Sequence, residues 1–169
     1  MYYINCFFIY SFIGYFFESF LSILKKEKIG SGILYGPWTP IYGVGGVLII
    51  LISNFIFSFF KIENWIETII CIIVITIILT FVEWVGGKLI EKVFHVTFWD
   101  YRRFKFNIGK YIALEVSFVW TLGSLLVIYV LQPLINKFIY FIPNYITYIL
   151  LFAMIVDYVV LFKKGKIHK

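Results

Sequence analysis

Residues 30–46 read GSGILYGPWTPIYGVGG, a stretch in which glycine and proline recur between two long apolar runs. Pro37 and Pro40 each disfavour helix in the residue before them, so the stretch predicts extended backbone up to about Trp38. Thr39 is then typical of a helix N-cap, and Pro40 of the first position of a helix. We call residues 30–46 the Gly/Pro segment. It predicts the start of a membrane helix whose unpaired N–H groups lie at one face of the bilayer.

The composition of the chain is that of an integral membrane protein. Of its 169 residues, 62% are hydrophobic and 22% aromatic, which is well above the share in soluble domains. The net charge of +6 does not indicate nucleic-acid binding, because the basic residues stand in short clusters between apolar runs. Cys6 and Cys71 lie inside apolar runs, so neither a disulfide nor a metal pair is expected, and no cofactor is expected.

Five apolar runs predict an all-α, polytopic membrane helix bundle that forms one transmembrane domain over residues 1–169. The first run has no basic residue before it and no small-residue cleavage site, so we expect a retained span rather than a signal peptide. Residues 133–143 form a shorter apolar piece that we expect at the membrane interface. The spans are expected at Tyr2–Leu24, Ile41–Phe60, Trp65–Ile90, Tyr111–Leu131 and Asn144–Phe162.

The distribution of Lys and Arg predicts the orientation of these spans. Thirteen of the 15 basic residues fall at connections or ends on one side, and only Lys61 and Lys137 fall on the other. Connections rich in Lys and Arg usually stay in the cytoplasm. The pattern therefore predicts an N-terminus outside and a C-terminus inside, with residues 30–39 on the cytoplasmic side.

Four carboxylates fall inside the predicted spans, each near the end assigned to the cytoplasm. Acids at such depths usually face protein or water rather than lipid. Small and hydroxyl residues at helical spacing around two of these acids favour helix–helix contacts. The acids are Glu18, Glu83, Glu115 and Asp157, and the neighbours are Ser11, Gly14 and Ser22 for Glu18, and Thr76, Thr80 and Gly87 for Glu83.

The acids are either structural acceptors or part of a path for a ligand, an ion or protons. We expect Glu18 to be the more structural and Glu83 the more functional, because Gly86 and Gly87 leave room beside Glu83. Together with the Gly/Pro segment, the acids would form a vestibule that faces the cytoplasm. The candidate ligand-binding or pathway residues are Glu18, Gly32, Tyr35, Gly36, Pro37, Pro40, Tyr42, Glu83 and Glu115.

The longest connection, residues 91–110, alternates aromatic rings with positive charges. This pattern is typical of contact with lipid head groups at the inner leaflet, or of a docking surface for a partner protein. Asp100 is expected to cap a helix or hold an arginine, and Asn107 with Gly109 to form a turn. The candidate contact residues are Trp99, Asp100, Tyr101, Arg102, Arg103 and Asn107.

Several motifs follow one another in a specific order: GILYGPWTPIYG at residues 32–43, EWVGG at 83–87, WDY at 99–101, NIGK at 107–110, and then Trp120. This order resembles the signatures of a bacterial membrane family described as type IV ABC-transporter permeases, the CmpB family. The resemblance covers about residues 12–123. One departure is Gly30-Ser31, which stands where members often have Asn-Arg before the glycine.

The resemblance implies a multi-pass permease subunit of an ABC-type transport system in the bacterial cytoplasmic membrane. The sequence has no phosphate-binding P-loop, so a cytoplasmic ATPase subunit would be the partner. Five spans are few for a solute path, which favours a homo- or hetero-oligomer surrounded by membrane lipids.

Two other functions stay open. One is an intramembrane enzyme that acts on a lipid or lipid-linked substrate at the inner leaflet, where two acids near a basic patch could hold an ion or a phosphate. His95 and His168 are the only histidines and belong to no nucleophile–base spacing, which argues against an enzyme. The other is a scaffold or regulator without a path of its own, which the small size favours.

Overall fold

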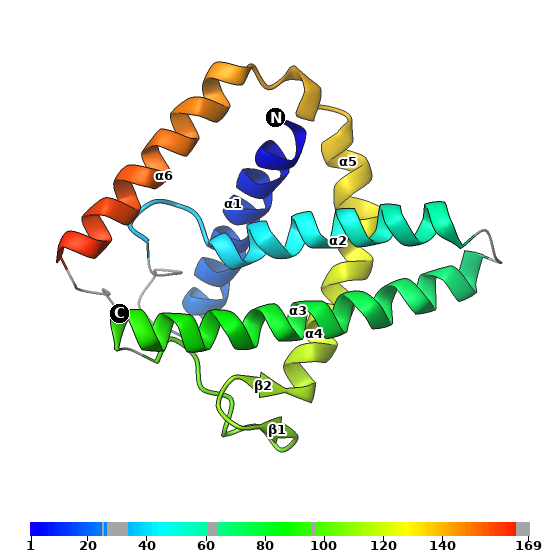
Figure 1. Cartoon of the computed structure of the whole chain (residues 1–169), viewed down its shortest axis with the longest axis horizontal. Helices are drawn as coiled ribbons and strands as arrows, with labels where there is room; N and C mark the ends of the chain where they lie inside the picture. The colour runs from blue at the N-terminus through cyan, green and yellow to red at the C-terminus, as the bar shows by residue number, and fades with distance from the viewer. Residues whose placement is uncertain (25, 27–33, 61–63, 96, 165–169) are drawn as a thin grey trace. The chain divides into compact units, whose positions relative to one another are not determined.

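The computed structural model describes residues 1–24, 26, 34–60, 64–95 and 97–164 (Figure 1). Gly32, one of the candidate ligand-binding residues, lies outside this part of the chain, as does the beginning of the Gly/Pro segment. The role expected for Gly32 therefore stays a prediction.

The described residues form the predicted all-α fold. Five of their helices are long and apolar enough to cross a membrane. The structure confirms the five spans, while the orientation of the termini stays a prediction. The elements in chain order are α1 (Tyr2–Leu24), α2 (Pro40–Phe59), α3 (Asn64–Phe94), β1 (Asn107–Ile108), β2 (Ile112–Ala113), α4 (Leu114–Leu126), η1 (Val127–Leu131), α5 (Gln132–Asn136), η2 (Ile139–Phe141) and α6 (Asn144–Lys164).

The fourth span runs from Leu114 to Asn136 and so passes its predicted end at Leu131. Its middle turn, η1, is a π-helix, after which the N–H of Gln132 donates to the carbonyl of Val127, five residues back. Pro133, which has no N–H, follows this π-helical turn directly, and such a turn is an irregularity at which a helix can accommodate proline. The piece expected at the interface, residues 133–143, therefore begins as the end of the fourth span.

The chain divides into two compact units. The first contains Met1–Val47 and Ile135–Lys169, and the second contains Leu48–Leu134. Each unit has a core and a set of polar contacts of its own. The expectation of one transmembrane domain stays a prediction.

In the first unit, α1 lies against the start of α2 through small residues. A Cβ atom at Gly43 would lie under 3.0 Å from Ser11 Oγ and from the carbonyl oxygen of Phe7, so this approach requires glycine. α6 joins the unit through Thr147, whose hydroxyl donates to Asn5 Oδ1 at 2.6 Å in the buried core. The helix–helix contact predicted around Ser11 is confirmed.

In the second unit, α3 and α4 are joined by paired hydroxyl groups. Thr76 bonds Thr121 at 2.8 Å, and one turn further on Thr80 bonds Ser117 at 2.9 Å. Hydroxyl pairs of this kind hold helices together where no water competes for them. The hydroxyl face predicted around Glu83 is therefore a real contact face of α3.

The connection between α3 and α4 ends in a small antiparallel hairpin, whose strands β1 and β2 pair Asn107 with Ala113 and Ile108 with Ile112. Gly109 in the turn has φ +70°, a conformation that glycine adopts without strain. The turn predicted at this position is confirmed. The hairpin leads directly into the first turn of α4, as Figure 1 shows.

Candidate functional site

A buried carboxylate of α6 holds the described part of the Gly/Pro segment. The backbone N–H groups of Tyr35 and Gly36 donate to Asp157 Oδ1 at 3.0 Å and Oδ2 at 2.8 Å. Trp38 Nε1 donates to Oδ2 at 2.9 Å. Asp157 is 7% exposed and Trp38 is 6% exposed. Because hydrogen bonds to an ionised acceptor are among the stronger ones in proteins, this carboxylate fixes the path of the segment.

Two prolines reduce the number of backbone N–H groups in the Gly/Pro segment that need an acceptor. Pro37 and Pro40 carry no N–H. The N–H groups of Trp38 and Thr39 donate to the carbonyl oxygens of Gly36 at 2.8 Å and Ser11 at 3.0 Å. The backbone donors of residues 35–39 are thus all satisfied, and α2 begins at Pro40 as predicted.

Glu18 of α1 accepts a hydrogen bond from Tyr42 of α2, at 2.6 Å from the hydroxyl to Oε1. A Cβ atom at Gly14, one turn before Glu18, would lie under 3.0 Å from the ring of Tyr42. The Tyr42 ring therefore packs against α1 at Gly14, and its hydroxyl reaches Glu18. The contact brings together two of the predicted pathway residues and supports the expectation that Glu18 is structural.

Glu83 of α3 is the corresponding acid of the second unit and is 5% exposed. Its Oε1 accepts the hydroxyl of Tyr101 at 2.5 Å, and its Oε2 accepts Trp120 Nε1 at 3.1 Å. Tyr101 belongs to the connection and Trp120 to α4, so one acid joins three parts of the unit. Tyr101 was expected to contact lipid or a partner, whereas its hydroxyl is directed at an acid inside the span.

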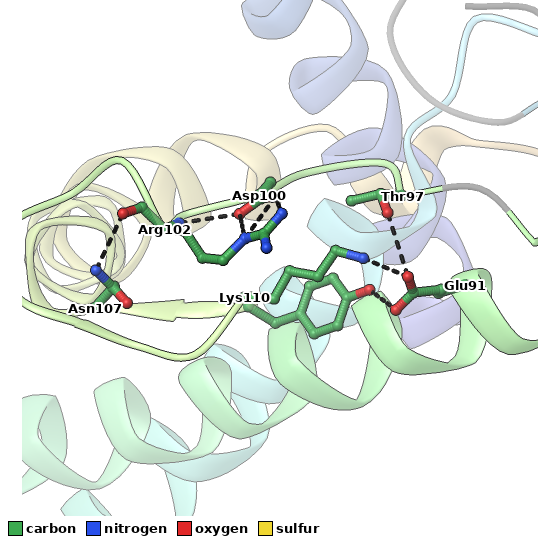
Figure 2. A network of polar contacts seen from close by, with 7 residues as sticks. Glu91, Thr97, Asp100, Arg102, Asn107 and Lys110 are labelled. Carbon is green, nitrogen blue, oxygen red and sulfur yellow. Dashed lines mark hydrogen bonds and ion pairs between the residues drawn. The ribbon is translucent and has the colours of Figure 1, made fainter.

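One end of the connection is tied to α3 by a second acid, Glu91 (Figure 2). Lys110 Nζ and the Tyr111 hydroxyl donate to its two carboxylate oxygens, and Thr97 Oγ1 donates at 3.3 Å. The hydrogen bond with Glu91 raises the pKa of Lys110. Burial, and then the bond to Glu91, raise the pKa of Tyr111. Sequence reasoning missed this cluster, because 19 residues separate Lys110 from Glu91.

Three of the residues expected to contact head groups or a partner form hydrogen bonds within the connection. Arg102 donates to Asp100 through its backbone N–H at 3.0 Å and through its guanidinium, with Nη2 at 2.5 Å from Oδ2. The Arg102 hydrogen bonds lower the pKa of Asp100 to about 2. Asn107 Nδ2 donates to the carbonyl of Phe104 at 2.6 Å. Asp100 thus holds an arginine, one of the two predicted roles.

Trp99 is the fifth of these contact residues, and its side chain is partly buried. Its ring lies edge-on to the ring of Tyr111, with 6.4 Å between the centroids. Its Nε1 is buried and has no acceptor among the described residues. Of the six residues, only Arg103 is exposed without an ion pair in the described part of the chain.

Glu115, the third predicted pathway acid, lies at the start of α4. Its Oε1 accepts the N–H of Phe106 at 3.2 Å, while Oε2 is buried and has no partner in the part of the chain that the structure describes. Beside it runs an open groove of about 500 Å³ between α3, α4 and the connection. The groove is lined by Thr76, Phe106, Leu114, Glu115, Ser117, Phe118 and Thr121.

The predicted site residues thus fall into two groups. The first unit joins the Gly/Pro segment and Tyr42 to Asp157 and Glu18, and the second joins Glu83 to the connection. That all the acids form one layer stays a prediction. Asp157 was expected to lie near this level, but its role as the acceptor for the Gly/Pro segment was missed, because 119 residues separate it from Trp38.

Each of the four acids predicted inside the spans accepts a hydrogen bond from another part of its own unit. These acids are Glu18, Glu83, Glu115 and Asp157. A carboxylate with a tyrosine hydroxyl can hold a proton or exchange one partner for another when that hydroxyl moves away. Within the described ranges, no group of three or more His, Cys, Asp and Glu side chains could hold a metal ion.

Comparison with known proteins gives one family. The model of a family described as "Putative ABC-transporter type IV" matches residues 5–162, which include most of both units. No curated protein and no solved structure matches the chain.

Proposed function

Because this chain belongs to the type IV ABC-transporter family, we propose that it is a permease subunit of an ABC-type transport system in the bacterial cytoplasmic membrane. The family and the five apolar helices support a multi-pass membrane protein related to transport. A cytoplasmic ATPase subunit would supply ATP hydrolysis, since the sequence contains no P-loop. The chain would act as an oligomer, because five spans are few for a path through the membrane.

The observation that best supports this function is the bond between Tyr101 and Glu83. Glu83 lies within the third span, and Tyr101 lies in the connection outside the spans. A movement of the connection would therefore change the hydrogen bonding of an acid inside the membrane domain. A permease driven by an ATPase needs a link of this kind, in which a displacement outside the spans alters a polar group within them.

Withdrawal of Tyr101 would remove one hydrogen bond from Glu83. A buried carboxylate that loses a hydrogen bond becomes more costly to keep charged. Glu83 would then bind a cation or the polar group of a solute in place of the hydroxyl. We infer that Glu83 alternates between Tyr101 and the transported species.

The experiment is affinity purification of the full chain from its own membranes in mild detergent, followed by an assay of ATP hydrolysis. We expect an ATP-hydrolysing subunit to copurify, and we expect Tyr101→Phe to retain that subunit while reducing the response of its ATPase activity to the permease. Tyr129→Phe is the matched control, because it removes a tyrosine hydroxyl that bonds Thr68 in the same unit, away from the acid.

Two results would count against the proposal. If no nucleotide-hydrolysing subunit copurifies, and crosslinking in cells before purification captures none either, the chain is not part of an ABC-type system. If Tyr101→Phe and Tyr129→Phe behave alike, the Tyr101–Glu83 bond is structural and does not link the connection to the spans.

A further inference from the structure

The hairpin between α3 and α4 carries a set of side chains that takes no part in the contacts with Glu83 and Glu91. Phe106 is 56% exposed and Ile108 is 74% exposed, and Arg103 and Lys105 are exposed beside them. We call these four residues the hairpin face. Its composition, two cations and two large apolar side chains, is that of a surface that meets both charge and hydrocarbon.

The backbone behind this face is held on both sides. Tyr101 precedes it and bonds Glu83, while Lys110 and Tyr111 follow it and bond Glu91. Asn107 closes the turn between them through its bond to the Phe104 carbonyl. The four exposed side chains therefore project from a fixed loop, so little conformational entropy is lost when they bind.

The face lies against the membrane-facing surface of the unit. Phe106 lines the same groove as Thr76 and Phe118, which belong to the third and fourth spans. Phe118 is 60% exposed on α4, as a side chain that faces lipid would be. The carbonyl of Phe106 also accepts the N–H of Leu114, the first residue of the fourth span, at 2.9 Å. The hairpin face therefore begins where the apolar surface of the spans ends.

The two cations of the face carry charge that no acid neutralises in the described part of the chain, where the ion pairs are Arg102–Asp100 and Lys110–Glu91. The Arg103 guanidinium lies 5.6 Å from the centre of the Phe104 ring, and Lys105 Nζ lies 5.4 Å from that of Phe106. Each cation thus lies beside an aromatic ring. This is the arrangement found at the head-group level of a bilayer, where rings sit among the head groups and cations meet phosphates.

We propose that the hairpin face binds anionic phospholipid. Arg103 and Lys105 contact the phosphate groups, and Phe106 and Ile108 enter the boundary between head groups and acyl chains. The charge of the face and its continuity with the lipid-facing groove select lipid over a protein partner. Of the contact residues predicted from the sequence, the proposal uses Arg103. The roles expected for Trp99, Asp100, Tyr101, Arg102 and Asn107 stay predictions.

The test uses the full chain with Ile108→Cys, labelled with an environment-sensitive fluorophore in nanodiscs. Cys6 and Cys71 are both 0% exposed, so the label goes to the new thiol. The nanodiscs contain phosphatidylcholine alone or phosphatidylcholine with phosphatidylglycerol. If the hairpin face contacts lipid, the emission of the label should be blue-shifted, and a nitroxide attached to the acyl chain should quench it. We also expect the anionic lipid to strengthen docking of the hairpin, measured by protection from iodide, roughly fivefold for each cation.

Two double variants separate specific binding from a general effect of charge. In Arg103→Gln/Lys105→Gln, the response to phosphatidylglycerol should disappear, although Ile108→Cys keeps its weaker contact with phosphatidylcholine. Lys92→Gln/Lys137→Gln is the matched control, since it removes two exposed lysines elsewhere and should keep the response.

Two outcomes would overturn the inference. A label that iodide reaches equally in both lipid compositions would show that the face lies in water. A label that is protected in native membrane vesicles, but open to iodide in nanodiscs of either composition, would show that another protein covers this face.

Discussion

Trp38 and Asp157 lie 119 residues apart in the sequence, and the indole Nε1 of the first donates to Oδ2 of the second at 2.9 Å. The second unit repeats this chemistry with other residues, because Trp120 Nε1 donates to Glu83 at 3.1 Å. In both units a buried acid accepts a tryptophan N–H and one or more donors from a non-helical segment. In each unit a buried carboxylate thus joins an irregular stretch of chain to a helix, and in the second unit Glu91 and Glu115 add further bonds to that stretch.

Replacement of Asp157 by Asn should lower the free energy of unfolding by about 2–3 kcal/mol, because the amide removes the charge and turns an N–H toward donors that need an acceptor. Trp38→Phe removes a single donor and should cost less. Ser58→Ala is the control, since this exposed hydroxyl bonds a carbonyl of its own helix. Denaturant titration in detergent measures the free energy of unfolding of all three variants. If Asp157→Asn is as stable as Ser58→Ala, Asp157 does not anchor the Gly/Pro segment.

Gly36→Val should prevent assembly of the first unit. A Cβ atom at Gly36 would lie under 3.0 Å from the Trp38 ring, which is itself held by Asp157 and the rings of Phe8 and Phe12. Ser58→Val adds a branched side chain at an exposed position of α2 and should be tolerated. Abundance in membranes and melting in detergent measure the difference. Equal tolerance at both positions would mean that the segment is a flexible connection.

Glu83→Gln should leave the protein inserted at normal abundance while abolishing its activity. The amide oxygen still accepts the Trp120 N–H, and the Tyr101 hydroxyl, unlike the N–H groups around Asp157, can accept the amide N–H, so the substitution removes the charge but keeps the bonds. Glu18→Gln should lower stability and activity together, because the Tyr42–Glu18 bond joins α1 to α2. Abundance, melting temperature and a growth or uptake phenotype are measured on both variants. A loss of melting temperature in Glu83→Gln alone would mean that the two roles are reversed.

The orientation of the spans can be tested by reporter fusions. Because 13 of the 15 basic residues fall on one side, a reporter after Lys169 should be cytoplasmic and one at Glu63 should be exported. The opposite result at both positions would place the connection between α3 and α4 outside the cell, where a cytoplasmic ATPase could not reach it.

The connection should keep its structure over a wide pH range. The pKa of Asp100 is lowered to about 2 from 3.8 by Arg102, so its stabilisation is present above 3.8 and is lost as the pH falls toward 2. The pKa of Lys110 is raised above 10.5 by Glu91, so its stabilisation is present below 10.5 and is lost as the pH rises past the raised value.

Hydrogen exchange in residues 97–113, corrected for the intrinsic rate, should therefore show constant protection between about pH 5 and pH 9. Asp100→Asn should reduce the loss on the acid side, where the ion pair between Glu91 and Lys110 is lost as well, and Lys110→Met should reduce the loss on the alkaline side. Protection that falls between about pH 7 and pH 5 would mean that a group other than these two controls the connection.

Local patterns in the sequence predicted much of this structure. Pro40 marks the start of α2, and Thr76 and Thr80 lie on the face of α3 that contacts α4, because helix starts and helix faces depend on neighbouring residues. Gly109 marks the turn of the hairpin for the same reason.

Contacts between distant residues were not predictable in this way. Nothing near Asp157 in the sequence indicates that its partners are Tyr35, Gly36 and Trp38. Tyr101 was assigned to the surface because its neighbours are basic, yet its hydroxyl bonds a buried acid. The direction of a side chain in an irregular loop depends on tertiary contacts, which one sequence without an alignment does not show.

The split of the first unit between the two ends of the chain has a consequence for biosynthesis. At about 5–20 residues per second, the ribosome needs on the order of ten seconds to reach Asp157 after it has made Trp38. During that time the indole N–H of Trp38 and the backbone N–H groups of Tyr35 and Gly36 lack the Asp157 carboxylate that accepts them in the folded protein. The second unit, Leu48–Leu134, is synthesised completely in the same interval. α6 is therefore made long after the segment that it holds in place, and truncation within α6 should release a segment made more than a hundred residues earlier.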